Sequence, residues 1–128
     1  MLQKINNDIR QHLKLNQWRS TTDAINWFKS LENKNNLHFI QMDIVNYYPS
    51  ITEELFLKAL EQASNIVHIE QKTKSTITKA RQSLLFHQQE AWIKNEGLFD
   101  VTMGAYDGAE VCELVGLLIL AEINKKTP

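Results

Sequence analysis

The chain has 128 residues, of which 43% are hydrophobic, and its fourteen Lys and Arg nearly balance its fifteen Asp and Glu. This length and apolar content fit one domain with a packed core, and the near-neutral charge excludes a basic nucleic-acid tail, an acidic tail and a disordered polyampholyte. The four glycines and two prolines are few, which favours a helix-rich domain over a turn-rich all-β one. The longest apolar run, 117–121, is too short to span a bilayer, so we expect no membrane partner. The sequence does not specify a location, and an intracellular one, in the cytoplasm or nucleus, is our expectation.

The first 45 residues predict two helices and a strand. Apolar residues recur at helical spacing over 3–13, which predicts an N-terminal helix. A second helix is predicted over 21–33, with Ser20 and Asp23 as a capping box at its start. Residues 37–45 are apolar on both faces of a two-residue period, which is typical of an interior strand.

The rest of the chain predicts three more helices and a hairpin. These elements are a helix over 52–63, a helix over 69–85, a hairpin that pairs 90–94 with 98–103 around a turn at 95–97, and an almost wholly apolar helix over 109–123. Ser50 and Glu53 predict a capping box for the first of these helices. The basic residues of the second, Arg81 among them, are interpreted as a solvated face. Cys112 lies in the last helix, where we expect a buried thiol.

This order indicates a helix-rich α+β fold with about five helices and little sheet. The final apolar helix has little predicted structure to pack against. We therefore hypothesise that the chain is a fragment, and that a missing part supplies more sheet.

Asp43 is the most informative polar position. It stands near the end of the apolar run 37–45, where a carboxylate is costly unless a partner compensates it. Hydrogen bonds from the turn that follows are one explanation, and a metal-binding or acid–base role is the other.

Two segments resemble the reverse transcriptase palm. Residues 43–51, Asp-Ile-Val-Asn-Tyr-Tyr-Pro-Ser-Ile, resemble motif A, in which an aspartate ends a strand and an aromatic, Pro, Ser and Ile enter a helix. Residues 103–110, Met-Gly-Ala-Tyr-Asp-Gly-Ala-Glu, resemble a retroelement-type variant of motif B, in which a glycine-containing loop precedes a long buried helix. The resemblance implies a partial palm domain over 18–128, preceded by a helical remnant of the fingers over 1–17.

The resemblance also implies a function and a set of site residues. It implies an RNA-directed DNA polymerase that acts on an RNA or DNA template–primer and dNTPs, with two Mg²⁺ or Mn²⁺ ions. Asp43 would bind both metals, and the backbone carbonyl of Ile44 would bind one of them. Tyr48 and Gly104 would contact the nucleotide, although core packing is the alternative for Tyr48 and a ligand-free turn is the alternative for Gly104. The implied template or primer contacts are Arg19, Ala105, Tyr106 and Gly108.

The sequence lacks one part of the family's pattern. Motif C, a hairpin with an Asp-Asp pair, normally follows the motif B helix, and this sequence contains no Asp-Asp pair. One aspartate does not hold two magnesium ions tightly, so we expect the isolated chain to be inactive without the missing C-terminal part of the palm. The alternative is a non-catalytic helical module, derived from a palm, that binds a partner or RNA.

Overall fold

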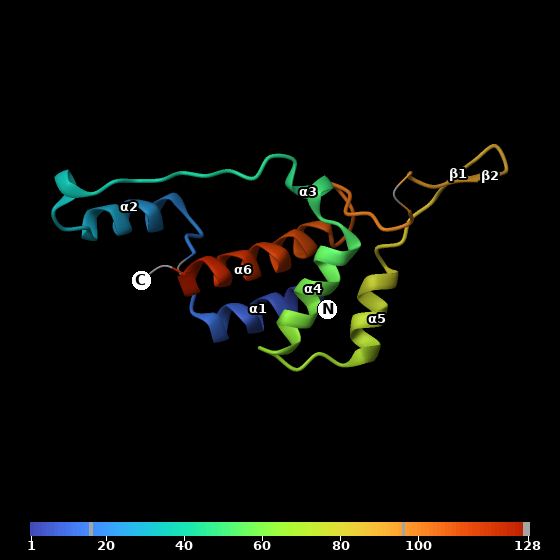
Figure 1. The fold of residues 1–128 in the computed structure, drawn as a ribbon, viewed down its shortest axis with the longest axis horizontal. Coiled ribbons are helices and arrows are strands. Elements are labelled where there is room, and N and C mark those ends of the chain that lie inside the picture. Colours follow the sequence, from blue (N-terminus) through green and yellow to red (C-terminus); the bar gives the residue numbers. More distant parts are fainter. Residues whose placement is uncertain (16, 96, 127–128) are drawn as a thin grey trace. The chain divides into compact units, whose positions relative to one another are not determined.

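A computed structural model describes residues 1–15, 17–95 and 97–126 of the chain (Figure 1). The elements, in order, are the helices α1 (Leu2–Leu13) and α2 (Thr21–Ser30), the 3-10 helix η1 (Lys34–Asn36), the helices α3 (Tyr47–Ser50), α4 (Glu53–Ser64) and α5 (Gln71–Lys79), the strands β1 (Leu85–His87) and β2 (Glu90–Trp92), and the helix α6 (Gly108–Lys126). The predicted helix-rich α+β class is confirmed, with one small antiparallel sheet among the described residues.

The chain divides into two compact units. The first comprises Met1–Leu15 together with Asn46–Pro128, and the second comprises Asn16–Val45. The helix α1 packs along α6 and therefore belongs to the first unit. No helix in the described ranges is long and apolar enough to cross a membrane.

The helix α6 is the centre of the first unit. It packs against both α1 and α4, which is why its apolar residues extend around most of its circumference (Figure 1). This corrects the expectation that the last helix has little to pack against. Its buried residues are Gly108, Val111, Cys112, Leu114, Val115, Leu117, Leu118 and Ala121. The burial of Cys112, at 6% exposed, is as predicted.

The helices α4 and α5 differ in detail from the prediction. Thr52, and not Ser50, caps α4: its hydroxyl accepts a 3.2 Å hydrogen bond from the Leu55 amide. The Ser50 hydroxyl instead donates to the Tyr47 carbonyl within the single turn of α3. The helix α5 ends at Lys79, six residues before the predicted end, because the chain then leaves the helix to pair with residues near Phe99.

The second unit confirms the predicted helix but not the predicted strand. The capping box is present, since the Ser20 hydroxyl accepts from the Asp23 amide at 3.2 Å and the Asp23 carboxylate accepts from the Ser20 amide at 2.9 Å. Residues 37–45 form no strand, because within the described part of the chain no other strand pairs with them. A strand needs a partner for its backbone N–H and C=O groups, and apolar alternation alone does not supply one.

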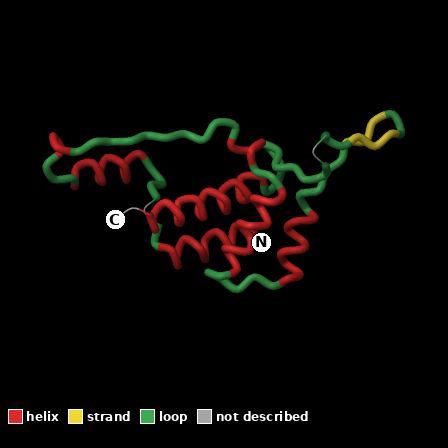
Figure 2. Tube along the Cα trace, viewed as in Figure 1, coloured by secondary structure: helices red, strands yellow, loops and turns green. Residues whose placement is uncertain are grey.

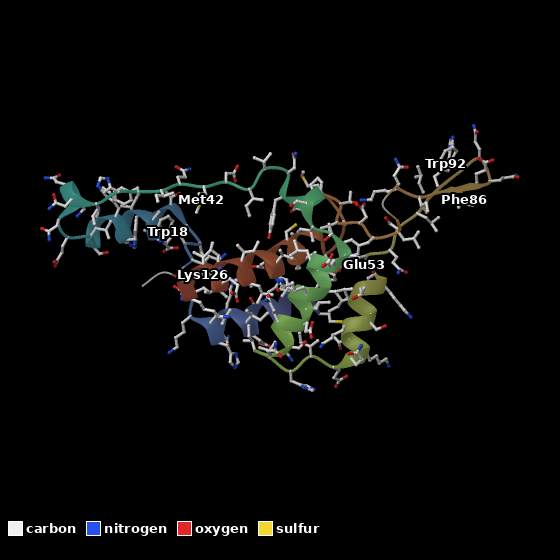
Figure 3. All side chains as sticks on the ribbon, viewed as in Figure 1. Trp18, Met42, Glu53, Phe86, Trp92 and Lys126 are labelled. Carbon is white, nitrogen blue, oxygen red and sulfur yellow. The ribbon has the colours of Figure 1, made fainter. Side chains whose placement is uncertain are left out.

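The two-stranded hairpin lies earlier in the chain than predicted, and at the predicted turn, 95–97, the described residues form only an isolated antiparallel bridge between Lys94 and Gly97. Leu85 pairs with Trp92 and Phe86 with Ala91, so the turn is Gln88-Gln89 (Figure 2). Both turn residues have positive φ, 49° and 65°, which is the backbone of a tight two-residue hairpin turn. Glutamine is not a usual signal for such a turn, which explains why the sequence predicts the hairpin at a later position in the chain. Phe86 and Trp92 stand out from the ribbon and are 68% and 56% exposed (Figure 3).

Candidate functional site

The loop over 102–108 connects the hairpin region to α6 through two consecutive tight turns. The Ala105 amide donates to the Thr102 carbonyl at 3.1 Å, and the Gly108 amide donates to the Ala105 carbonyl at 3.2 Å. Gly104 has a φ of +90°, a conformation that residues with a side chain rarely adopt. A Cβ on Gly108 would lie 2.7 Å from the Thr102 carbonyl oxygen. Both glycines are therefore required by the path of the loop itself.

Asp100 anchors the first end of this loop. Its carboxylate accepts hydrogen bonds from the Thr102 hydroxyl and from the Lys94 ammonium. The Lys94 ammonium, followed by the Thr102 hydroxyl, lowers the pKa of the Asp100 carboxyl group below its usual value. The backbone is held as well, because the Asp100 amide donates to the Arg81 carbonyl at 2.8 Å.

Arg81 anchors the other end. Its guanidinium forms an ion pair with the carboxylate of Asp107, the residue just before α6. Arg81 is only 8% exposed, so it does not belong to the solvated basic face that the sequence predicts. The chain turns out of α5 immediately before Arg81, which points this side chain inward while Lys79 remains exposed.

The middle of the loop faces solvent. Tyr106 is fully exposed, Met103 is 75% exposed, and Ala105 is half-buried. An aromatic ring that is held on a fixed loop and touches little of its own protein is available to stack on a ligand. The sequence-predicted contacts Gly104, Ala105, Tyr106 and Gly108 thus lie together in one constrained loop.

Tyr47 and Tyr48 lie against α6 near Cys112, about one helical turn beyond the end of this loop. The Tyr47 hydroxyl donates a 2.7 Å hydrogen bond to the Cys112 carbonyl, and burial raises the pKa of Tyr47 to about 12. Gly116 leaves room for this ring, because a Cβ there would lie 3.2 Å from the Tyr47 hydroxyl oxygen. Tyr48 is half-buried and packs on the same core. Tyr48 therefore has a packing role, and part of its surface remains accessible.

The three remaining site residues lie in the second unit. Arg19, Asp43 and Ile44 are exposed. The Arg19 backbone amide donates to the Asp23 carboxylate at 2.9 Å, which makes it part of the start of α2. Among the described residues, nothing donates a hydrogen bond to the Asp43 carboxylate, so the predicted bonds from the turn that follows are not formed.

The donor set for a metal is incomplete. The Asp43 carboxylate and the Ile44 carbonyl are hard oxygen ligands of the kind that Mg²⁺ prefers, but Mg²⁺ requires six ligands in an octahedron. Within the described ranges, no three His, Cys, Asp or Glu side chains are grouped closely enough to hold a metal ion. The described residues therefore do not by themselves fit a pair of magnesium ions.

Sequence reasoning missed the polar contacts between α1 and α6. Asn6 is completely buried, and its amide donates to the Glu110 carbonyl at 2.9 Å and to the Glu113 carboxylate at 3.1 Å. Arg10 forms an ion pair with Glu113. The available signal was the position of Asn6 next to Ile5 on the apolar face of α1.

The chain matches no known protein family, no curated protein and no solved structure with which it was compared.

Proposed function

We propose that this chain is part of the palm of an RNA-directed DNA polymerase. The observation that carries the proposal is the loop over 102–108, which is constrained at both ends, presents Tyr106 to solvent and leads directly into the buried helix α6. A motif B segment needs this arrangement, in which a glycine-containing loop faces the substrates and a packed helix supports it.

The segment 37–45 supports the same proposal. Its side chains are unusually exposed for apolar residues, with Ile40 at 85%, Met42 at 79% and Val45 at 78%. Burying one such side chain contributes about 1.5–3 kcal/mol to stability, so a sheet that covered this segment would stabilise it. In a complete palm, further strands would pair with it beside Asp43 and would bring the additional carboxylates.

In this proposal, each described residue has a limited task. Asp43 would contribute one of several carboxylates that hold metal ions, and those ions would supply charge stabilisation for nucleotidyl transfer. Tyr48 keeps part of its surface accessible to the nucleotide, and Tyr106 stacks on a nucleobase or sugar. Gly104 allows the loop to approach that ligand closely.

The second candidate is a non-catalytic module that binds RNA or a protein. The second unit favours it, because its aromatic rings form an exposed group: the Trp18 and Trp27 centroids are 4.9 Å apart and Phe39 lies 6.1 Å from Trp27. Trp18 is 50% exposed (Figure 3). Exposed rings stack on single-stranded bases, but a net charge of −1 provides little attraction for phosphates.

The test is primer extension by the product of the reading frame beyond Pro128, where that frame stays open. We expect this longer protein to extend a primer with Mg²⁺ and dNTPs, and Asp43→Asn to abolish extension because a metal ligand is lost. Glu61→Gln, an exposed change on α4, is the matched control and retains activity. The 128-residue chain alone incorporates no nucleotide. Undiminished extension by Asp43→Asn would remove Asp43 from the site, and an inactive longer protein without an Asp-Asp pair would favour the binding module.

A further inference from the structure

We infer that Arg81 is a positioning residue: through its ion pair with Asp107, it fixes the loop over 102–108 and thereby the direction of Tyr106. The inference rests on the proposed function, in which this loop faces the nucleotide or template. It adds a residue that lies between the two palm-like segments, 43–51 and 103–110.

The burial of Arg81 needs an explanation beyond stability. Transferring a guanidinium from water into a protein interior costs several kcal/mol, and the carboxylate that pairs with it offsets only part of this cost. Apolar side chains of similar volume often serve stability as well or better at such positions. What an apolar pair lacks is direction, because a charged pair is strong only when guanidinium and carboxylate meet in one geometry. The Arg81–Asp107 pair therefore specifies where Asp107 lies.

Arg81 is suited to this role because its own backbone is held on both sides. Its amide donates to the Thr78 carbonyl at 3.0 Å, and its carbonyl accepts from the Asp100 amide at 2.8 Å. The neighbouring Ser83 amide donates to the Leu98 carbonyl at 2.8 Å. The guanidinium is thus carried by a segment attached to the end of α5 and to residues 98–100, and it does not move with the loop.

Asp107 transmits this constraint to the loop. Its carbonyl accepts the Val111 amide at 3.1 Å in the first turn of α6, and the adjacent Gly108 lies against the Thr102 carbonyl. Tyr106, immediately before Asp107, is fully exposed, so no packing of its ring fixes its direction. The backbone sets the Cα–Cβ direction of Tyr106, and the Arg81–Asp107 pair holds this part of the backbone.

The first arm of the test measures loop motion in the 128-residue chain. Backbone amide order parameters from NMR relaxation are compared for wild type, Arg81→Ala, Arg81→Lys and the exposed control Lys79→Ala. We expect values near those of a rigid backbone, about 0.85, at residues 104–107 of wild type and Lys79→Ala, and a fall toward about 0.6 in Arg81→Ala. Arg81→Lys keeps the charge but not the planar guanidinium, so we expect its order parameters at these residues to lie between those of wild type and Arg81→Ala. Unchanged values in Arg81→Ala, or an equal fall throughout α6, would overturn the inference.

The second arm measures substrate use in the longer polymerase. Arg81→Ala should raise the KM for dNTP by about tenfold with less than a threefold change in kcat, and Arg81→Lys should recover part of the loss. A purely structural role would instead reduce the active fraction, lowering kcat at constant KM, and this result would overturn the inference. If the wild-type longer polymerase shows no extension, the proposed function fails, whereas the order parameters still decide whether Arg81 positions the loop.

Discussion

Replacing Tyr47 with Phe tests how the palm-like segment is fixed to the central helix. The change removes one hydroxyl, which donates a 2.7 Å hydrogen bond to the Cys112 carbonyl, and leaves the ring in place. A hydrogen bond of this kind contributes about 1 kcal/mol net. We therefore expect Tyr47→Phe to be less stable than wild type by about 1 kcal/mol at pH 7, which shifts the urea midpoint by roughly 0.5 M.

The same residue predicts a pH dependence. Burial raises the pKa of Tyr47 from 10.0 to about 12, so the folded chain disfavours the phenolate. A folded-state pKa above the unfolded one contributes stability that is complete below pH 10 and is lost as the pH rises to about 12. The full difference corresponds to at most about 2.7 kcal/mol, and the partial exposure of the ring reduces the expected loss to about 1 kcal/mol. The advantage of wild type over Tyr47→Phe should therefore disappear near pH 12.

Urea unfolding followed by circular dichroism at pH 7, 10 and 11.5 measures both effects. Groups that do not interact with Tyr47 titrate equally in the two proteins, so their contributions cancel in the difference. Tyr106→Phe is the matched control, because that ring is fully exposed, and its stability should equal that of wild type throughout. Equal stability of Tyr47→Phe and wild type at pH 7, or a difference that stays constant up to pH 11.5, would refute the reasoning.

Two further predictions concern the loop that precedes α6. Gly108→Ala should lower stability by about 2 kcal/mol, because its Cβ meets the Thr102 carbonyl oxygen at 2.7 Å, whereas Gly104→Ala has open space and should cost only about 1 kcal/mol from its positive φ. Thermal unfolding compares the two, and equal losses would count against the close approach at Gly108. Asp100→Asn should be less stable than wild type at pH 7, and the difference should vanish as the pH falls through the lowered folded-state pKa of Asp100, since a lowered carboxyl pKa contributes stability only above it. A difference that persists at low pH in acid titrations of both proteins would show that the Lys94 pair is not its cause.

The candidate site was partly predictable from the sequence. The glycines, Tyr106 and the following apolar helix stand together in the chain, so their common location in one loop follows from local spacing. Asp43 stays a prediction as a metal ligand, because the carboxylates that would join it are not in this sequence. The role of Arg81 was not predictable, because its partner Asp107 lies on a different segment. The partners of Asp100, Lys94 and Thr102, are close in the chain, but no sequence motif marks them.

The sequence predicts the helices α1, α4 and α6 with their buried faces, because a helix forms from contacts between residues three and four apart. It also determined the Ser20–Asp23 cap and the burial of Cys112. It does not predict that α2 buries no residue or that α5 ends at Lys79. The folded structure alone shows that residues 37–45 remain unpaired, that β1 pairs with β2 through a Gln-Gln turn, and that Arg81 points inward. The Arg81–Asp107 ion pair joins residues far apart in the chain, so its formation depends on which partners the fold brings within reach. The β1–β2 pairing is local, but its Gln-Gln turn carries no usual turn signal in the sequence.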